Sequence, residues 1–235
     1  RKVDVAGFNT SMERQRAEAR RAWSGSGDAA TETLWFELKE AVGSSEFLGY
    51  ETEAIEGVVT AVVVEGQSVQ EASVGQSAMV LTNQTPFYGE SGGQQGDRGL
   101  LFSADEAEFV VTDTRKNLES LHVHIGEVRK GLVSVGQTLE LQVENCRRAQ
   151  LRANHSVTHV LHEALRRELG DHVTQKGSLV SPDYLRFDFS HPKAMNETEL
   201  IAVEAEVNRC IRENMAVATR IMTPEEAVEE GALAL

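Results

Sequence analysis

The sequence predicts an α+β protein in three parts: a helical segment over residues 1–45, a small β-barrel subdomain over 46–145 and an α+β domain over 146–235. Three observations predict this order. Helical periodicity dominates the first part, and short β-branched stretches separated by glycine-bearing turns fill the second. In the third, helices and strands alternate. A chain of 235 residues is long enough for one large domain or two small ones.

The first part should form two helices. Residues 4–22 keep an apolar stripe that includes Phe8 and Met12, with arginines on the other sides. The Gly/Ser stretch over residues 24–30 ends that helix, and a second, short helix is expected over residues 31–42.

The middle part should form the barrel. Five or more short strands with regular punctuation are typical of a small barrel or sandwich. We expect the strands at residues 57–65, 76–81, 108–114, 121–128 and 138–143.

The last part combines helices with a hairpin. A helix is expected over residues 149–169, followed by two strands around the turn Ser181-Pro182-Asp183. Asn196 and Glu199 form a capping box that opens a helix to about residue 214. The two hairpin strands are expected at 177–180 and 184–189. The remaining expected elements are a strand at 216–222 and a short helix that starts at Thr223.

Charge and composition limit the function. The net charge of −14 argues against a broad nucleic-acid surface, but basic residues concentrate at 1–21 (net +3) and 145–167 (net +4), where a polyanion could bind locally. No apolar run reaches the ~18 residues of a membrane span. Two distant cysteines predict a reducing, cytoplasmic location. The chain starts at Arg and ends within a pattern, so we expect it to be a piece of a longer protein.

Two histidines on the predicted long helix are the main metal signal. His155 and His159 are one helical turn apart, so their imidazoles can share one zinc ion. The residue after His155 is serine, which excludes the H-E-x-x-H pattern of zinc proteases. The alternative is a groove wall without metal. His162 is expected to pack, and His122 with His124 to share an exposed sheet face.

Four motifs in the correct order resemble the editing domain of alanyl-tRNA synthetases, and the resemblance covers about residues 47–235. They are Asn154-His155-x-x-Thr158-His159, Gln175-Lys176-Gly177-Ser178, the stretch LRFDFSH over residues 185–191 and PFYGESGGQQGDRG over residues 86–99, which we call the glycine loop. The stretch FNTSMERQRAEAR at the start also resembles the segment that precedes that domain, which free-standing editing proteins lack.

The resemblance implies a barrel followed by the α+β domain shared by threonyl- and alanyl-tRNA synthetases. It implies hydrolysis of the ester that joins serine or glycine to alanine tRNA. ATP and Mg²⁺ would serve an aminoacylation region of the parent ligase that is absent here. In the family a C-x-x-x-H pair completes the zinc site, and only His155 and His159 match, so we expect this chain to hold zinc weakly and to edit poorly.

Site residues follow from the same motifs. Gln175 and Thr158 are expected as catalytic residues that read the serine hydroxyl. The glycine loop is expected to line the substrate pocket through Gly92, Gly93 and Gln94, since such loops allow close backbone approach. Contacts to the tRNA backbone are expected from Arg147, Arg148 and Arg152.

Two alternatives remain open. One is a threonyl-type or free-standing aminoacyl-tRNA deacylase, against which the opening helix argues. The other is a non-catalytic tRNA-binding module. The sequence indicates no membrane partner and does not indicate an oligomeric state.

Overall fold

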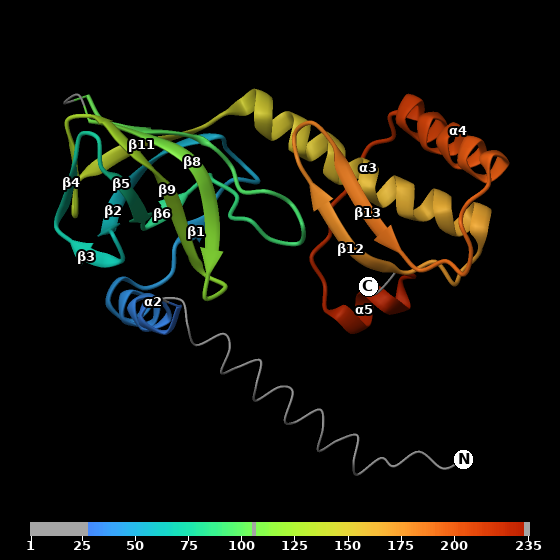
Figure 1. The fold of residues 1–235 in the computed structure, drawn as a ribbon, viewed down its shortest axis with the longest axis horizontal. Coiled ribbons are helices and arrows are strands. Elements are labelled where there is room, and N and C mark those ends of the chain that lie inside the picture. The colour runs from blue at the N-terminus through green and yellow to red at the C-terminus, as the bar shows by residue number, and fades with distance from the viewer. Residues whose placement is uncertain (1–27, 105–106, 233–235) are drawn as a thin grey trace, which may run out of the picture.

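The computed structural model describes residues 28–104 and 107–232, so the predicted helix at 4–22 and its arginines lie outside the described residues. Figure 1 shows a barrel, a long helix that leaves it and a second lobe built on that helix. The elements are α2 Asp28–Val42, β1 Glu46–Phe47, β2 Ala54–Val64, β3 Gln67–Val69, β4 Glu71–Ser73, β5 Ser77–Thr82, β6 Gln84–Thr85, β7 Gly99–Phe102, β8 Glu108–Asn117, β9 Leu121–Lys130, β10 Leu132–Ser134, β11 Thr138–Val143, α3 Asn145–Leu169, β12 Gln175–Val180, β13 Leu185–Phe189, α4 Glu197–Glu213 and α5 Pro224–Glu229.

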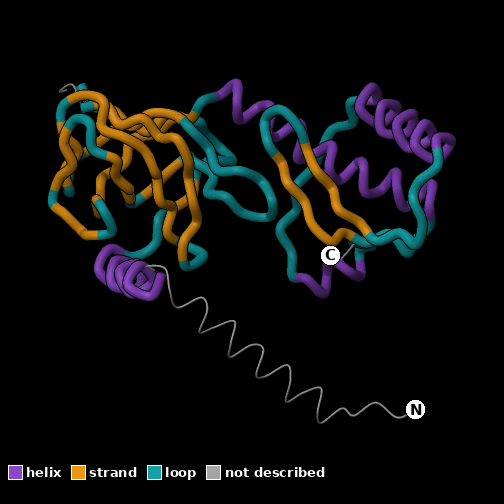
Figure 2. The backbone as a smooth tube through the Cα atoms, in the orientation of Figure 1, coloured by secondary structure: helices purple, strands orange, loops and turns teal. Residues whose placement is uncertain are grey.

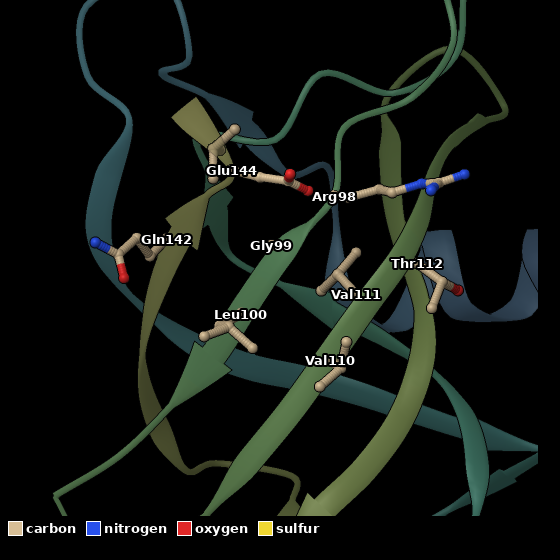
Figure 3. Close-up of a pocket in the computed structure, with 9 residues that line it drawn as sticks. Arg98, Gly99, Leu100, Val110, Val111, Thr112, Gln142 and Glu144 are labelled. Carbon is tan, nitrogen blue, oxygen red and sulfur yellow. The ribbon is translucent and has the colours of Figure 1, made fainter. Parts of the chain in front are cut away.

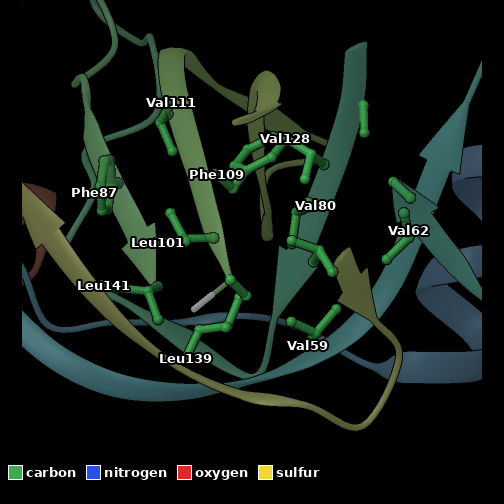
Figure 4. Packing of buried hydrophobic residues seen from close by; sticks show 14 of the residues in the cluster. Val59, Val62, Val80, Phe87, Leu101, Phe109, Val111, Val128, Leu139 and Leu141 are labelled. Carbon is green, nitrogen blue, oxygen red and sulfur yellow. The ribbon is translucent and has the colours of Figure 1, made fainter. Parts of the chain in front are cut away.

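Six antiparallel strands close the barrel. Their order is β2-β5-β9-β8-β7-β11, and β11 pairs back onto β2, so this sheet has no open edge between its first and last strands. Buried aliphatic side chains and two phenylalanines, Phe87 and Phe109, fill the interior (Figure 4). The barrel prediction is confirmed, although the short strand β7 between β8 and β11 was not expected.

Helix α2 covers part of the outer barrel surface. Trp35 and Leu38 pack on side chains from β2, β5 and β9, including Leu121 and Val123. Both faces of the start of β9 are therefore buried. The expectation that His122 and His124 lie on an exposed sheet face is wrong, because α2 covers one face of this strand and the barrel interior covers the other.

The second lobe consists of α3, the β12–β13 hairpin and α4 (Figure 1). Its buried centre consists of Ala164 and Leu165 from α3, Val203 from α4, and Val173 from the segment between α3 and β12. The aromatic rings of Phe187 and Phe189 pack against that centre from the hairpin. The capping box at Asn196/Glu199 forms as predicted, and the predicted short helix begins after Thr223, where a second capping box forms with Glu226.

The predicted strand at 216–222 does not form, which corrects that expectation. Residues 215–223 belong to no helix or strand, although the stretch is rich in strand-forming residues. Val217 is 89% exposed and Ile221 100% exposed. A strand needs a neighbour for its backbone groups, and no described strand lies beside this segment.

None of the described helices has both the length and the apolarity that a membrane crossing requires.

Candidate functional site

Helix α3 carries the histidine pair. It starts four residues earlier than predicted and ends at Leu169, followed by the C-cap Gly170, whose φ of 114° is rarely adopted by residues with a side chain. The rings of His155 and His159 stack with centroids 5.3 Å apart and planes 23° apart. Burial, and then the neighbouring His159, hold the pKa of His155 below its usual value. A neutral imidazole, the form that binds metal or accepts a proton, is therefore favoured.

The glycine loop leaves the barrel and reaches the β12–β13 hairpin, as the tube in Figure 2 shows. Gly92 and Gly93 have φ values of +59° and +83° and form its tight turn. A Cβ atom on Gly93 would lie 2.4 Å from Ser178 Oγ and 2.6 Å from the Ser178 carbonyl oxygen. Only glycine permits this close approach of the loop to β12.

The loop pairs with the end of strand β12. The Val180 N–H donates to the Gly93 carbonyl at 2.7 Å, and the Gln95 N–H donates to the Val180 carbonyl at 3.1 Å. Gln94, between these two bonds, forms a parallel bridge with Val180. The barrel loop is therefore joined to the hairpin by an isolated bridge at Val180.

Gln94 joins the loop to the histidine pair. Its side chain is buried, with 5% of the residue exposed, and Nδ1 of His155 donates to its amide oxygen Oε1 at 2.6 Å. The sequence placed Gln94 in the pocket as a substrate contact, whereas the structure shows that its amide oxygen contacts a histidine.

Arg147 and Arg148 bind the glycine loop, so the expectation that they contact tRNA phosphates is corrected. Arg147 donates to the Gly96 carbonyl at 2.8 Å and to Gln95 Oε1 at 3.0 Å. Arg148 forms a buried ion pair with Asp97 and also donates to the carbonyl oxygens of Pro86 and Gly49. Both guanidinium groups are buried and bound by protein oxygens, so neither faces a solvent-borne phosphate.

Arg152 and Asn154 differ from that pair. Arg152 is exposed on the same helix and stays a predicted tRNA contact. The Asn154 amide donates to the carbonyl oxygens of Ser181 and Pro182 at 2.8 and 3.0 Å, which fixes the hairpin turn on α3.

The two predicted catalytic residues lie on separate elements of the second lobe. Thr158 is buried on α3 and donates its hydroxyl to the Asn154 carbonyl at 2.8 Å, so that hydroxyl can only accept a further hydrogen bond. Gln175 starts β12, and its amide nitrogen donates to Ser178 Oγ at 3.3 Å. Ser178 also faces Gly92 and Gly93, so Gln175 and these glycines belong to one site.

The donor set supports half of a zinc site. Neutral imidazoles are ligands that zinc takes, and Nδ1 of His155 already has a partner in the manner of metal-bound histidines. Within residues 28–104 and 107–232, no three His, Cys, Asp or Glu side chains gather closely enough to hold a metal. His155 and His159 therefore fit zinc only as two ligands of an incomplete set.

One cavity lies beside His159 and a second lies on the barrel wall. One of about 290 Å³, between α3 and α4, is lined by His159, Glu163, Glu206 and Cys210 among others. Another, of about 440 Å³, lies on the barrel wall beside Arg98, Val110 and Glu144 (Figure 3). The second contains none of the predicted site residues.

Sequence reasoning did not identify Asp97, Asn154 or Val180 as parts of the site. Asp97 accepts from the Tyr88 N–H at 2.6 Å as well as from Arg148, so it joins both ends of the loop. Asp97 and Asn154 both lie inside motifs named in the sequence analysis. The available signal was their polar side chains, which can hydrogen-bond a second helix or loop.

Three further histidines, His122, His124 and His162, are packed inside the structure. His124 donates from Nδ1 to the Val80 carbonyl at 2.9 Å and accepts from the Thr85 hydroxyl at 2.8 Å. His122 stacks on Phe47 with 8° between the ring planes, and its Nδ1 is buried without a partner. His162 packs on Phe187, as expected.

Comparison with known proteins supports the resemblance. The chain is 59% identical over 233 residues to an alanine–tRNA ligase of Parvibaculum lavamentivorans, covering 99% of this chain and 26% of that protein. It is 56% identical over 238 residues to an alanine–tRNA ligase of Paramagnetospirillum magneticum, covering 99% of this chain and 27% of that protein. The chain thus spans about a quarter of the length of these relatives. The similarity to alanyl-tRNA synthetases predicted from the motifs is confirmed. Residues 1–147 match the family described as tRNA synthetases class II (A), and the chain therefore belongs to the class II (A) tRNA synthetases.

Proposed function

We propose that this chain is the part of an alanyl-tRNA synthetase that hydrolyses wrongly formed aminoacyl-tRNA. The substrates would be alanine tRNA carrying serine or glycine. One observation carries the proposal: the glycine loop, the histidine pair of α3 and the Gln175–Ser178 stretch of β12 meet at one place, although they come from three distant parts of the sequence. The ATP- and Mg²⁺-dependent attachment of alanine would belong to the complete ligase, in the cytoplasm.

The need for such a site follows from substrate chemistry. Serine differs from alanine by one hydroxyl group, and an apolar pocket rejects so small an addition only weakly. A second, hydrolytic site that recognises the hydroxyl removes the error. Thr158 has lone pairs left to accept from a serine hydroxyl, and Gln175 has a second amide proton to donate. We assign them the reading of the substrate hydroxyl.

The remaining residues hold and orient the ester. Gly92 and Gly93 give the substrate carbonyl access to backbone N–H groups of the glycine loop. When no metal is bound to its Nε2, His155 can accept a proton from the attacking water, because burial favours its neutral form. A zinc ion bound by His155 and His159, with further ligands, would supply positive charge next to the carbonyl or the water. Arg152 is placed to meet a phosphate of the tRNA acceptor end.

The test is deacylation of alanine tRNA charged with serine, glycine or alanine, with and without added Zn²⁺. We expect the first two esters to be cleaved faster than the alanine ester, and zinc to increase the rate. Cleavage of threonine tRNA charged with serine would instead favour a threonyl-type deacylase.

A non-catalytic tRNA-binding module is the second candidate, and the incomplete donor set around His155 and His159 favours it. Specific binding of alanine tRNA together with hydrolysis no faster than in buffer, with and without Zn²⁺, would support this module and refute the hydrolase.

A further inference from the structure

We propose that Gln94 is a positioning residue that fixes His155 in the tautomer with its proton on Nδ1, so that Nε2 remains the basic nitrogen of the site. The value of this nitrogen for hydrolysis rests on the function proposed above. The tautomer itself can be measured without any hydrolysis.

The contact between the two side chains determines the tautomer. An amide oxygen only accepts hydrogen bonds, so the 2.6 Å contact between Gln94 Oε1 and His155 Nδ1 requires a proton on Nδ1. A neutral imidazole carries one ring proton, which leaves a lone pair on Nε2. Nε2 can therefore accept a proton or bind a metal cation.

Gln94 is itself held on both sides by backbone hydrogen bonds. Val180 binds the preceding residue, Gly93, and the following residue, Gln95. Arg147 then binds the side chain of Gln95 and the carbonyl oxygen of Gly96. With 5% of the residue exposed, the Gln94 side chain has little freedom to leave His155 for water.

The loop and the helix run side by side in opposite directions. His155 meets Gln94, and Arg148, seven positions earlier on α3, meets Asp97, three positions later in the loop. Seven helical residues rise about 10 Å, and three extended residues span about 10 Å. This match of lengths lets one stretch of loop contact the helix at both places. A segment of the barrel thus sets the chemical state of a histidine in the second lobe.

The experiment measures the ring nitrogens of His155 directly, by long-range ¹H–¹⁵N NMR on the 235-residue chain at a pH well above the ordinary imidazole pKa. His155 is assigned by its loss in His155→Gln. Gln94→Met removes the acceptor, Gln94→Glu retains an acceptor at the same place, and Arg147→Met loosens the loop. Gln84→Met is the matched control, because Gln84 binds the Glu56 carbonyl on the barrel, away from α3. Deacylation of seryl-tRNA(Ala) is measured for each variant in parallel.

We expect a protonated Nδ1 in the native chain, in Gln94→Glu and in Gln84→Met. In Gln94→Met we expect the proton to shift mainly to Nε2, and in Arg147→Met a mixture of both tautomers. A proton on Nε2 in the native chain, or an unchanged tautomer in folded Gln94→Met, would overturn the proposal. If the tautomer behaves as expected and seryl-tRNA(Ala) is not cleaved, the positioning role stands and the hydrolase fails.

Discussion

Arg148 on α3 and Asp97 in the glycine loop form an ion pair buried between the barrel and the second lobe, with only 6% and 1% of their side chains exposed. Removing one partner of such a pair leaves an uncompensated charge in the interior, which costs about 3–5 kcal/mol. We expect Arg148→Met to lower the free energy of unfolding by that amount in urea denaturation. Arg186→Met, which breaks the exposed pair with Asp188, should cost less than about 1 kcal/mol. Equal losses of stability in the two variants would contradict a stabilising role for the buried Arg148–Asp97 pair.

Gly93 should tolerate substitution less well than its neighbour Gly92. Both have positive φ, which costs another residue about 1–2 kcal/mol. Only Gly93 also meets backbone and side-chain atoms of Ser178, whereas a Cβ on Gly92 meets nothing within 4 Å. Gly93→Ala should therefore separate the loop from β12 and lower deacylation at least tenfold, while Gly92→Ala should reduce stability only modestly. Thermal melts and deacylation rates of the two variants make the comparison.

Acid should destabilise the barrel through its buried histidines. Burial lowers the pKa of both His122 and His124 to about 4 in the folded protein, from the ordinary value of 6.5 in the unfolded chain. The unfolded chain therefore binds protons first as the pH falls. Stability is fully present above pH 6.5 and falls between pH 6.5 and 4, by up to about 1.4 kcal/mol per pH unit for each group.

His122→Phe tests this pH dependence. The change removes the buried Nδ1 atom that has no partner and keeps a ring to stack on Phe47. We expect about half of the acid sensitivity to disappear, together with unchanged or higher stability at neutral pH. Urea denaturation at a series of pH values measures both effects. An acid sensitivity equal to that of the native chain would exclude His122 as a source.

Thr158→Val should affect serine clearance more than folding. Valine has nearly the same shape as threonine. The hydroxyl that it lacks gives the Asn154 carbonyl a second hydrogen bond, in addition to the one that this carbonyl accepts within the helix. We expect seryl-tRNA(Ala) deacylation to fall about tenfold, equivalent to about 1.4 kcal/mol, with little change in the melting temperature. Thr112→Val, on the outer barrel wall, should change neither quantity. If Thr158→Val deacylates seryl-tRNA(Ala) at the native rate, Thr158 does not read the serine hydroxyl.

Binding of tRNA should depend on salt through Arg152. Each phosphate contact adds about one to the slope of log K against log salt concentration. Arg152→Gln should reduce this slope by about one, whereas Arg212→Gln at the far end of α4 should leave it unchanged. Filter-binding titrations at several salt concentrations provide the slopes, and an unaltered slope for Arg152→Gln would exclude this contact.

Local patterns predicted much of the fold. The strands β5, β8, β9 and β11, the long helix and the capping box at Asn196 and Glu199 depend on neighbouring residues, and the structure confirms them. Strand β7 was missed because it is short and its place is decided by β8 and β11 across the sheet. The strand at 216–222 was predicted wrongly because propensity does not supply a pairing partner.

The site was harder to predict for a related reason. His155 and His159 could be paired from helical spacing alone, and the structure stacks them. Burial of Arg147 and Arg148 depends on a loop some fifty positions away, which no local pattern reports. The basic charge at the start of this helix therefore predicted phosphate contacts, although the two guanidinium groups bind carboxylate and carbonyl oxygens of the same chain.

The location of Arg147 and Arg148 decides how this molecule can be divided. By secondary structure the barrel ends at Val143 and α3 begins at Asn145. A barrel cut there would keep the Asp97 carboxylate and the Gly96 carbonyl in its wall but lose the guanidinium groups that bind them. The first turn of α3 is therefore an integral part of the barrel, while the rest of the helix is the spine of the second lobe. The barrel defined by its strands alone is therefore incomplete, and truncation between residues 143 and 148 should leave it unstable.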